Sequence, residues 1–235
     1  MSAARAVPYG EGMEGFYGPA ARDLQARFDT TALADRLESV IVVDALSEDD
    51  RRFVGSRDFF FLSTVSDDGF PTVSYKGGAP GLVTVLDPTT LAFPNYDGNG
   101  MYLSMGNIVE TARIGMLFID FERPTRLRVQ ATAALSDRAD LLERYPGAQL
   151  VVVAKITQAW VNCPRYIHRH VRVADSPYVP DTEGRAPVAP WKRIDFVQDS
   201  LPEADRAEVA AAGGTISRER YAELLAEEAG AGEGS

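Results

Sequence analysis

The segment from Ser74 to Gly81 joins a cation to a glycine-rich turn, a combination suited to a flat anionic ligand. It reads Ser-Tyr-Lys-Gly-Gly-Ala-Pro-Gly, so a predicted strand delivers Lys76 to the turn that begins at Gly77. Side chains alternate along a strand, and Ser74 and Lys76 therefore share one face. The glycines let a ligand lie against bare backbone. A wide strand connection with an exposed lysine is the plainer interpretation of the same residues.

A second polar segment runs from Asn95 to Asn107 and ends in a predicted short helix. The N–H groups in the first turn of a helix can bind an anion. Ser104 and Asn107 are three residues apart and share one helical face. No Walker pattern and no G-x-G-x-x-G motif leading into a long helix occurs here, and a capped loop is the plainer alternative. The candidate ligand-binding residues of this segment are Asn95, Asn99, Ser104 and Asn107.

Two arginines, Arg126 and Arg128, flank a leucine in a predicted strand. Alternation along a strand points both guanidinium groups to the same side, so they supply two cations to one surface. The alternative is a solvated sheet face on which the arginines pair with Asp120 or Glu122.

The segment Trp-Val-Asn-Cys-Pro-Arg-Tyr-Ile-His at 160–168 gathers an aromatic ring, an amide, a thiol and a cation. It begins where a predicted strand ends, and Pro164 suits the first turn of a helix. A lone cysteine is more often an inert buried residue than a nucleophile. The candidate pocket residues here are Trp160, Asn162, Cys163 and Arg165.

Metal and triad chemistry find little support in the sequence. Two histidines, His168 and His170, without a matching carboxylate motif are too few for a metal site. A Ser-His-Asp triad is not indicated, because no Gly-x-Ser-x-Gly elbow occurs. The sequence therefore predicts no metal and designates no catalytic residue.

Composition narrows the possible partners. The 235 residues include 24 Lys and Arg against 34 Asp and Glu, for a net charge of −10. This balance disfavours nucleic-acid binding, and a phosphate site must then be a local cluster of cations or N–H groups. No apolar run approaches the ~20 residues that cross a bilayer, and no secretory signal is visible at the N-terminus. A single cysteine suits a reducing compartment, so we expect a cytoplasmic protein without membrane attachment.

Hydrophobic patterning predicts a mainly β fold, a barrel or a sandwich with peripheral helices. Asp67–Gly69 is a tight-turn signal between two strands and predicts a hairpin. Few helices alternate with the strands, which disfavours a doubly wound parallel sheet. The seven predicted strands are 59–65, 71–75, 82–86, 91–93, 114–119, 126–135 and 150–156.

Helical and irregular segments flank the predicted strands. We expect an arm at 1–17, a proline-rich extended stretch at 174–192 and a disordered end at 229–235. Helices are predicted over 19–43 with a break at Thr30-Thr31, over 47–53, 136–145 and 203–212, and from Ser217 onward. The predicted organisation is an N-terminal arm with helices at 1–44, a barrel domain at 45–173 and a tail with terminal helices at 174–235.

Taken in order, the four segments resemble the pyridoxamine 5′-phosphate oxidase-like, FMN-binding split β-barrel superfamily, and most closely its uncharacterised bacterial branch. The resemblance covers about residues 58–168 and rests on Gly-Gly-x-Pro-Gly, Tyr-x-Ser-x-Gly-Asn, the basic strand and Trp-x-Asn-Cys-Pro. It implies a split β-barrel, FMN as cofactor, and a homodimer with two flavin sites at the subunit interface.

The resemblance also implies roles for individual residues. Ser74, Lys76 and Gly77 are expected near the flavin ring or phosphate, and Asn95, Asn99, Ser104 and Asn107 near the phosphate and ribityl chain. Arg126 is expected near the ring with Arg128 on the same face, and Trp160 and Asn162 are expected near the ring, from the same or from the other subunit. Many relatives carry Arg or Lys after the loop glycine and asparagine, whereas this chain has Gly100-Met101.

The expected function is that of an FMN-dependent oxidoreductase acting on a small molecule by hydride transfer through the flavin N5. A cation near the pyrimidine end of the ring, Lys76 or Arg126, would stabilise the anionic reduced flavin. The alternatives are a flavin-binding or structural barrel without turnover, and the same barrel holding F420 or haem. Vitamin B6 oxidation is not implied, because the substrate-binding residues of the true oxidase have no clear match.

Overall fold

A computed structural model describes the chain over residues 15–230. The predicted arm up to residue 14 and the predicted disordered end from residue 231 lie outside the described residues. The disorder predicted at Ala229 and Gly230 is wrong, because the last helix continues through both. The chain divides into two compact units, one up to Val171 and one from Arg172 onward.

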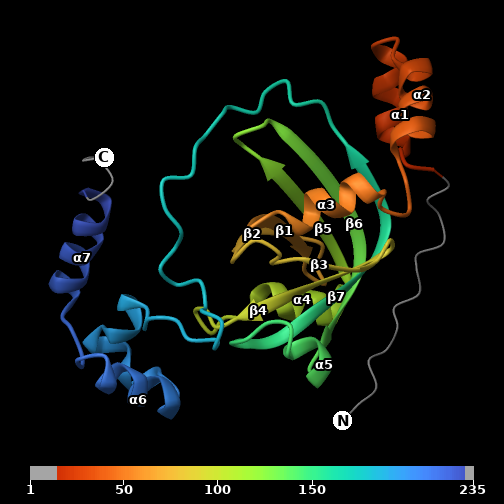
Figure 1. The fold of residues 1–235 in the computed structure, drawn as a ribbon. Coiled ribbons are helices and arrows are strands. Elements are labelled where there is room, and N and C mark those ends of the chain that lie inside the picture. The colour runs from red at the N-terminus through yellow and green to blue at the C-terminus, as the bar shows by residue number, and fades with distance from the viewer. Residues whose placement is uncertain (1–14, 231–235) are drawn as a thin grey trace. The chain divides into compact units, whose positions relative to one another are not determined.

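The first unit is built on a seven-stranded antiparallel sheet, with the order β2-β1-β5-β6-β7-β4-β3 (Figure 1). All seven predicted strands are confirmed, and so is the predicted hairpin, in which β1 and β2 pair. The fold is therefore mainly β with flanking helices, consistent with a split barrel. The strands are β1 (Phe59–Val65), β2 (Pro71–Gly77), β3 (Thr84–Asp87), β4 (Thr90–Tyr96), β5 (Arg113–Asp120), β6 (Thr125–Ser136) and β7 (Ala148–Val161).

Alternation along the strands explains where the core lies. On β1 the side chains of Phe60, Leu62 and Thr64 are fully buried, while those between them are only partly buried. The ring of Phe60 packs on Phe93 and Phe118, with centroids 5.0 and 5.5 Å apart. Burying each such ring stabilises the fold by roughly 1.5–3 kcal/mol. The three rings come from β1, β4 and β5, so their contact holds these strands together.

The helices of the first unit follow their local signals. The predicted break at Thr30-Thr31 separates two helices, and Ser47 forms a capping box with Asp50 at the start of a third. The predicted helix 136–145 is wrong in length, because beyond Leu142 the chain continues only as single turns into Pro146-Gly147. The helices are α1 (Pro19–Arg27), α2 (Thr31–Ile41), α3 (Glu48–Gly55), α4 (Leu103–Thr111) and α5 (Ala139–Leu142).

Pro164 suits the first turn of a helix, but no helix follows it. A single hydrogen bond from the Ile167 N–H to the Pro164 carbonyl closes one turn, and the chain then runs without regular structure. Proline permits a helical start, but this segment lacks the apolar periodicity that holds a helix to a core.

The second unit holds the predicted terminal helices. Its centre is Lys192, which is buried and pairs with Asp205 at 3.1 Å. Its helices are η1 (Pro190–Arg193), η2 (Asp195–Ser200), α6 (Glu203–Ala211) and α7 (Arg218–Gly230). Across residues 15–230, no helix is both long enough and apolar enough to span a membrane.

Candidate functional site

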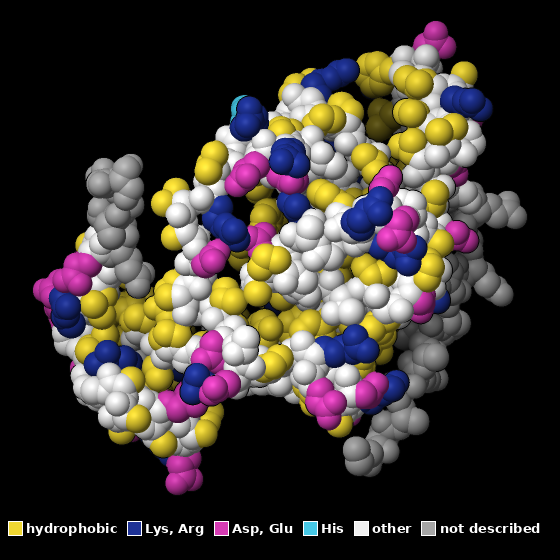
Figure 2. Space-filling view, in the orientation of Figure 1, with side chains coloured by type: hydrophobic (Ala, Val, Ile, Leu, Met, Phe, Trp, Pro, Cys, Tyr) yellow, Lys and Arg dark blue, Asp and Glu magenta, His cyan; other side chains and the backbone are white. Residues whose placement is uncertain are grey.

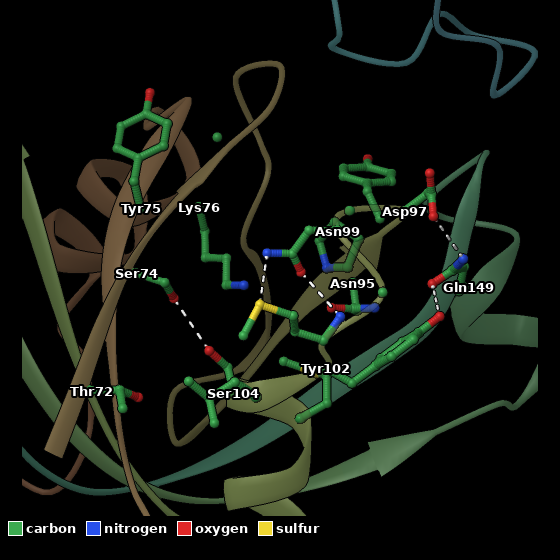
Figure 3. Close-up of a pocket in the computed structure, with 18 of the residues that line it drawn as sticks. Thr72, Ser74, Tyr75, Lys76, Asn95, Asp97, Asn99, Tyr102, Ser104 and Gln149 are labelled. Carbon is green, nitrogen blue, oxygen red and sulfur yellow. Dashed lines mark hydrogen bonds between the residues drawn. The ribbon is translucent and has the colours of Figure 1, made fainter. Parts of the chain in front are cut away.

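A cleft of about 410 Å³ opens between the edge strand β2 and the start of α4 (Figure 3). Its remaining walls are the end of β4 and the loop 97–102. The volume lies within the range of pockets that bind small molecules. Of the residues predicted from the sequence, the cleft is lined by Ser74, Lys76, Gly77, Asn95, Asn99 and Ser104.

Strand β2 contributes one polar face to the cleft. Thr72, Ser74 and Lys76 alternate with more exposed residues and are each partly buried. Lys76 lies opposite Phe60 in the β1–β2 register, so it points to the core side of the sheet. The Ser74 and Ser104 hydroxyl oxygens are 3.4 Å apart, which ties this face to the first turn of α4 (Figure 3).

Lys76 is the cation of this cleft. Burial lowers the pKa of its ammonium group below the ordinary value, because the charged form is poorly solvated there. Among the described residues no carboxylate forms an ion pair with it, although acidic and basic side chains are interspersed over the face of the molecule drawn in Figure 2. An anionic ligand in the cleft would restore the charged form and gain a charge-assisted hydrogen bond.

The N-terminus of α4 presents free N–H groups to the same space. Leu103, Ser104 and Met105 line the cleft, and the first N–H bonded within the helix is that of Gly106, to the Tyr102 carbonyl at 2.7 Å. No side chain caps the helix and no acidic residue stands in its first turn. Tyr102 holds a left-handed conformation with φ of 49°, a strained geometry for a residue with a Cβ. This helix end is thus shaped to accept an anion.

The loop before α4 is held by its own side chains. The Met101 N–H donates to the Asn99 side-chain oxygen at 3.1 Å, and the Asn99 amide nitrogen lies 3.3 Å from the Met101 sulfur. At the rim, the Tyr102 hydroxyl donates to the Gln149 Oε1 at 2.8 Å, and the Gln149 Nε2 donates to Asp97 at 3.4 Å (Figure 3). These contacts fix the width of the cleft mouth.

Several residues of the cleft were missed by sequence reasoning. Thr72 could have been found, because the alternation that pairs Ser74 with Lys76 continues to it. Gln149 could not, since its contact with Tyr102 joins positions 47 residues apart.

Asn107 lies below the cleft and does not line it. Only 4% of it is exposed, and its amide donates to the Thr64 hydroxyl at 2.9 Å and, more weakly, to Thr72 at 3.5 Å. Thr64 and Thr72 in turn bond each other at 2.8 Å. The side chain therefore joins α4, β1 and β2 under the floor of the site.

The arginines of β6 and Trp160 at the end of β7 project from the other side of the sheet. Strand register places Tyr75, Phe61, Leu117, Arg128 and Trp160 in one row across five strands, which we call the outer row. Paired residues in antiparallel strands project to the same face, so the outer row points away from the core and from Lys76.

Arg126 lies beside this row, and its Nη2 donates to the Cys163 carbonyl at 3.0 Å. Among the described residues, neither arginine forms the alternative ion pair with Asp120 or Glu122, and Asp120 pairs instead with Arg57 at 3.0 Å. The remaining predicted residues, which line no part of the cleft within one chain, are Arg126, Arg128, Trp160, Asn162, Cys163 and Arg165.

The geometry of this barrel and its cleft agrees with a family comparison. The family model for pyridoxamine 5′-phosphate oxidase matches residues 46–163, which is half of the chain and includes all seven strands. The chain belongs to this family. The resemblance in the sequence is thereby confirmed, while the assignment of individual site residues stays a prediction.

Solved structures give further likenesses to the barrel region of this family member. A candidate pyridoxamine 5′-phosphate oxidase of Lactobacillus delbrueckii is 26% identical, with 50% of this chain and 95% of that chain covered and a TM-score of 0.41. An FMN-binding protein of Syntrophomonas wolfei is 15% identical (60% and 96% covered, TM-score 0.39), and the haem storage protein HutZ of Vibrio cholerae is 18% identical (48% and 89% covered, TM-score 0.35). Among curated proteins, none matches the chain.

Proposed function

We propose that the chain binds FMN in the cleft between β2 and α4 and works as a flavin-dependent oxidoreductase on a small molecule. One observation carries this proposal. Lys76, the Ser74 and Ser104 hydroxyls and the uncapped start of α4 converge on a single cleft in a chain of net charge −10. Such convergence favours an anionic ligand, and the family favours a flavin.

The residues present fit a flavin phosphate. A phosphate needs donors and positive charge, and Lys76, two hydroxyl groups and the free N–H groups of α4 supply both. They take over the role of the side-chain cation that many relatives carry where this chain has Met101. The amides of Asn95 and Asn99 line the same cleft and suit the hydroxyls of a ribityl chain.

Bound FMN supplies two-electron chemistry through hydride transfer at its N5 atom, and the protein supplies binding, orientation and electrostatics. In this division of labour Lys76 and the α4 N-terminus hold the phosphate end. The hydrogen-bonded rim of Tyr102, Gln149 and Asp97 sets the position of the cleft mouth. Burial also raises the pKa of Tyr96, so its hydroxyl stays protonated beside the site.

We further propose that the site is completed by a second copy of the chain. Arg126 Nε, on the outer side of β6, and Asn162 Oδ1, just after β7, are buried and have no hydrogen-bond partner within the described part of the chain. Buried polar atoms normally have partners, so these two support a ligand or subunit at this face. In a homodimer, Arg126, Arg128, Trp160 and Asn162 of one subunit would approach the flavin held by the cleft of the other.

Haem and deazaflavin F420 are the two alternative cofactors for this cleft. Haem held by a histidine ligand is not favoured within one chain, because neither His168 nor His170 is among the residues that line the cleft. Deazaflavin F420 also carries phosphate and would use the same donors. Competition between FMN and F420 in a fluorescence titration separates these two.

The visible spectrum of the purified protein tests the proposal. We expect a yellow protein, or one that takes up added FMN with a shifted flavin spectrum. A colourless protein that takes up no FMN would contradict it. Turnover is tested by anaerobic mixing of the flavin-loaded protein with NADH or NADPH, where rapid bleaching supports an oxidoreductase and a persistently oxidised flavin supports a barrel without turnover.

A further inference from the structure

Helices α1 and α2 form a hairpin with an uncovered apolar face. No residue of α1 is buried, and Ala34 is the only buried residue of α2. Five large apolar side chains of the hairpin are 41–65% exposed, and hydrophobic side chains are visible over the hairpin at the upper right of Figure 2. These five are Leu24, Phe28, Leu33, Leu37 and Val40.

The opposite side of the hairpin is polar, and charged side chains there already form ion pairs within the hairpin. Spacings of three and four residues put the apolar residues of each helix on one side. On the other side Arg22 pairs with Asp35 and Glu38 and lies 4.9 Å from the Tyr17 ring, so it links the two helices. Helices of nine and eleven residues are marginal in water on their own. The hairpin therefore requires a surface that covers its apolar face.

Both ends of the hairpin are fixed at the end of β7. The Phe16 ring meets the Trp160 ring edge-on at 5.0 Å, and Val43 exchanges two backbone hydrogen bonds with Ala159, at 2.9 and 2.7 Å. Trp160 is the last member of the outer row. The hairpin thus starts at the margin of the outer sheet face, whose far strand exposes Val73 (70%) and Tyr75 (62%).

We propose that the apolar face of the α1–α2 hairpin docks on the outer sheet face of a second copy of this chain. This inference rests on the homodimer in the proposed function. Each chain exposes apolar side chains on the hairpin and on the outer sheet face at β2. In a two-fold dimer the hairpin of each copy covers the outer face of the other, so the same contact forms twice and both surfaces are buried. Stable interfaces have apolar anchors at their centre, and the exposed apolar side chains of the hairpin and of β2 can serve as such anchors.

Cross-linking between chains tests this contact. In a Cys163→Ala background, Leu33→Cys chains and Val73→Cys chains are co-expressed with different affinity tags, purified over both tags and treated with a short bismaleimide. A covalent dimer of the two differently tagged chains supports the proposal. If Leu33→Cys chains cross-link to each other, the hairpins contact each other and the proposal is overturned. If Leu33→Cys cross-links preferentially to Leu225→Cys, on α7, the hairpin contacts the second unit and the proposal is also overturned.

Dissociation of the dimer gives an independent measurement. Leu33→Glu with Leu37→Glu should raise the dimer dissociation constant at least about tenfold by sedimentation equilibrium. The exposed Arg36→Glu on the same helix is the matched control and should leave it within about twofold. Unchanged dimerisation of the double variant, or a wild-type chain that sediments as a monomer, would overturn the proposal.

FMN titration of the wild-type chain distinguishes failure of the hairpin contact from failure of the proposed flavin-binding function. A chain that binds FMN and dimerises but shows no Leu33–Val73 cross-link contradicts the hairpin contact alone. A chain that gives the cross-link but binds no FMN supports the hairpin contact and contradicts the proposed function.

Discussion

The two faces of β2 differ in what they can do within a single chain. The inner face carries Thr72, Ser74 and Lys76 and, with α4, encloses a cleft. The outer face carries the exposed Val73 and Tyr75, and the outer row continues from Tyr75 through partly exposed side chains to Trp160. Because neighbouring side chains of a strand point to opposite sides, one seven-residue segment serves a ligand on one side and offers a surface to a partner on the other.

The contrast explains why the predicted site residues fall into two groups. Those on β2, β4 and the loop 97–102, together with Ser104 of α4, line one cleft within a single chain, and Asn107 lies below it. Those on β6 and after β7 lie on the outer face and, in our proposal, reach a flavin only across a subunit interface. The following predictions test each side of this division.

The largest effect is expected from Lys76→Glu. It replaces the cation of the cleft with an anion that repels phosphate, and we expect the FMN dissociation constant to rise about 100-fold, equivalent to about 3 kcal/mol. Lys155→Glu, on the exposed part of β7, is the matched control and should change it less than about threefold. Equal affinities of the two variants, measured by flavin fluorescence quenching, would remove the inner face from the site.

Asn107→Ala should act on stability more than on binding. It removes the amide that bonds Thr64 and leaves buried polar groups less satisfied, so we expect a loss of about 1–3 kcal/mol in the free energy of unfolding. Urea denaturation of the apoprotein measures this loss. The exposed Asn99→Ala serves as the control, with an expected change within about 0.5 kcal/mol but a weaker affinity for FMN. The reverse pattern would place Asn107 in the ligand site.

The pH dependence of FMN binding should reflect Lys76. Burial lowers the pKa of this ammonium group, and the free protein loses the charge as pH rises through that lowered value. The FMN dissociation constant should then rise with pH by at most about tenfold per unit, the limit for one proton. Lys76→Gln should bind weakly with a flat profile in the same range. A pH-dependent wild type and an equally pH-dependent variant would assign the effect to another group.

The smallest effect is expected from Cys163→Ala. Arg126 bonds the main-chain carbonyl of Cys163, so the contact survives loss of the thiol. Cys163 is exposed, and we expect the free energy of unfolding, measured by urea denaturation, to stay within about 0.5 kcal/mol of wild type. The flavin content, read from the visible spectrum, should stay nearly unchanged. Large loss of flavin on this change would give the thiol a role in the site.

Features that depend on interactions between near neighbours in the sequence were predictable. All seven strands were predictable, because alternation and turn residues such as Asp67–Gly69 are local signals. Ser74 and Lys76 were correctly placed on one face for the same reason. Pro164 suits a helix start, but no helix forms after it, because a favourable first residue does not compensate for the absence of a surface to pack against.

Long-range geometry limited the rest. The helical spacing of Ser104 and Asn107 put them on one side of α4, but only tertiary packing shows that Ser104 lines the cleft while Asn107 sits below it. The outer position of Arg128 depends on the register of strands as distant in sequence as β1, where Phe61 lies 67 residues before it, and no local pattern encodes this register.

A subunit-mixing measurement tests the central claim most directly. Lys76→Glu and Arg126→Glu are each expected to bind FMN weakly as homodimers. If one site combines Lys76 of one subunit with Arg126 of the other, a heterodimer of the two variants contains one site with both native residues, and tight FMN binding should return on mixing. No recovery of tight binding in verified heterodimers would contradict a flavin site shared between the inner face of one copy and the outer face of the next.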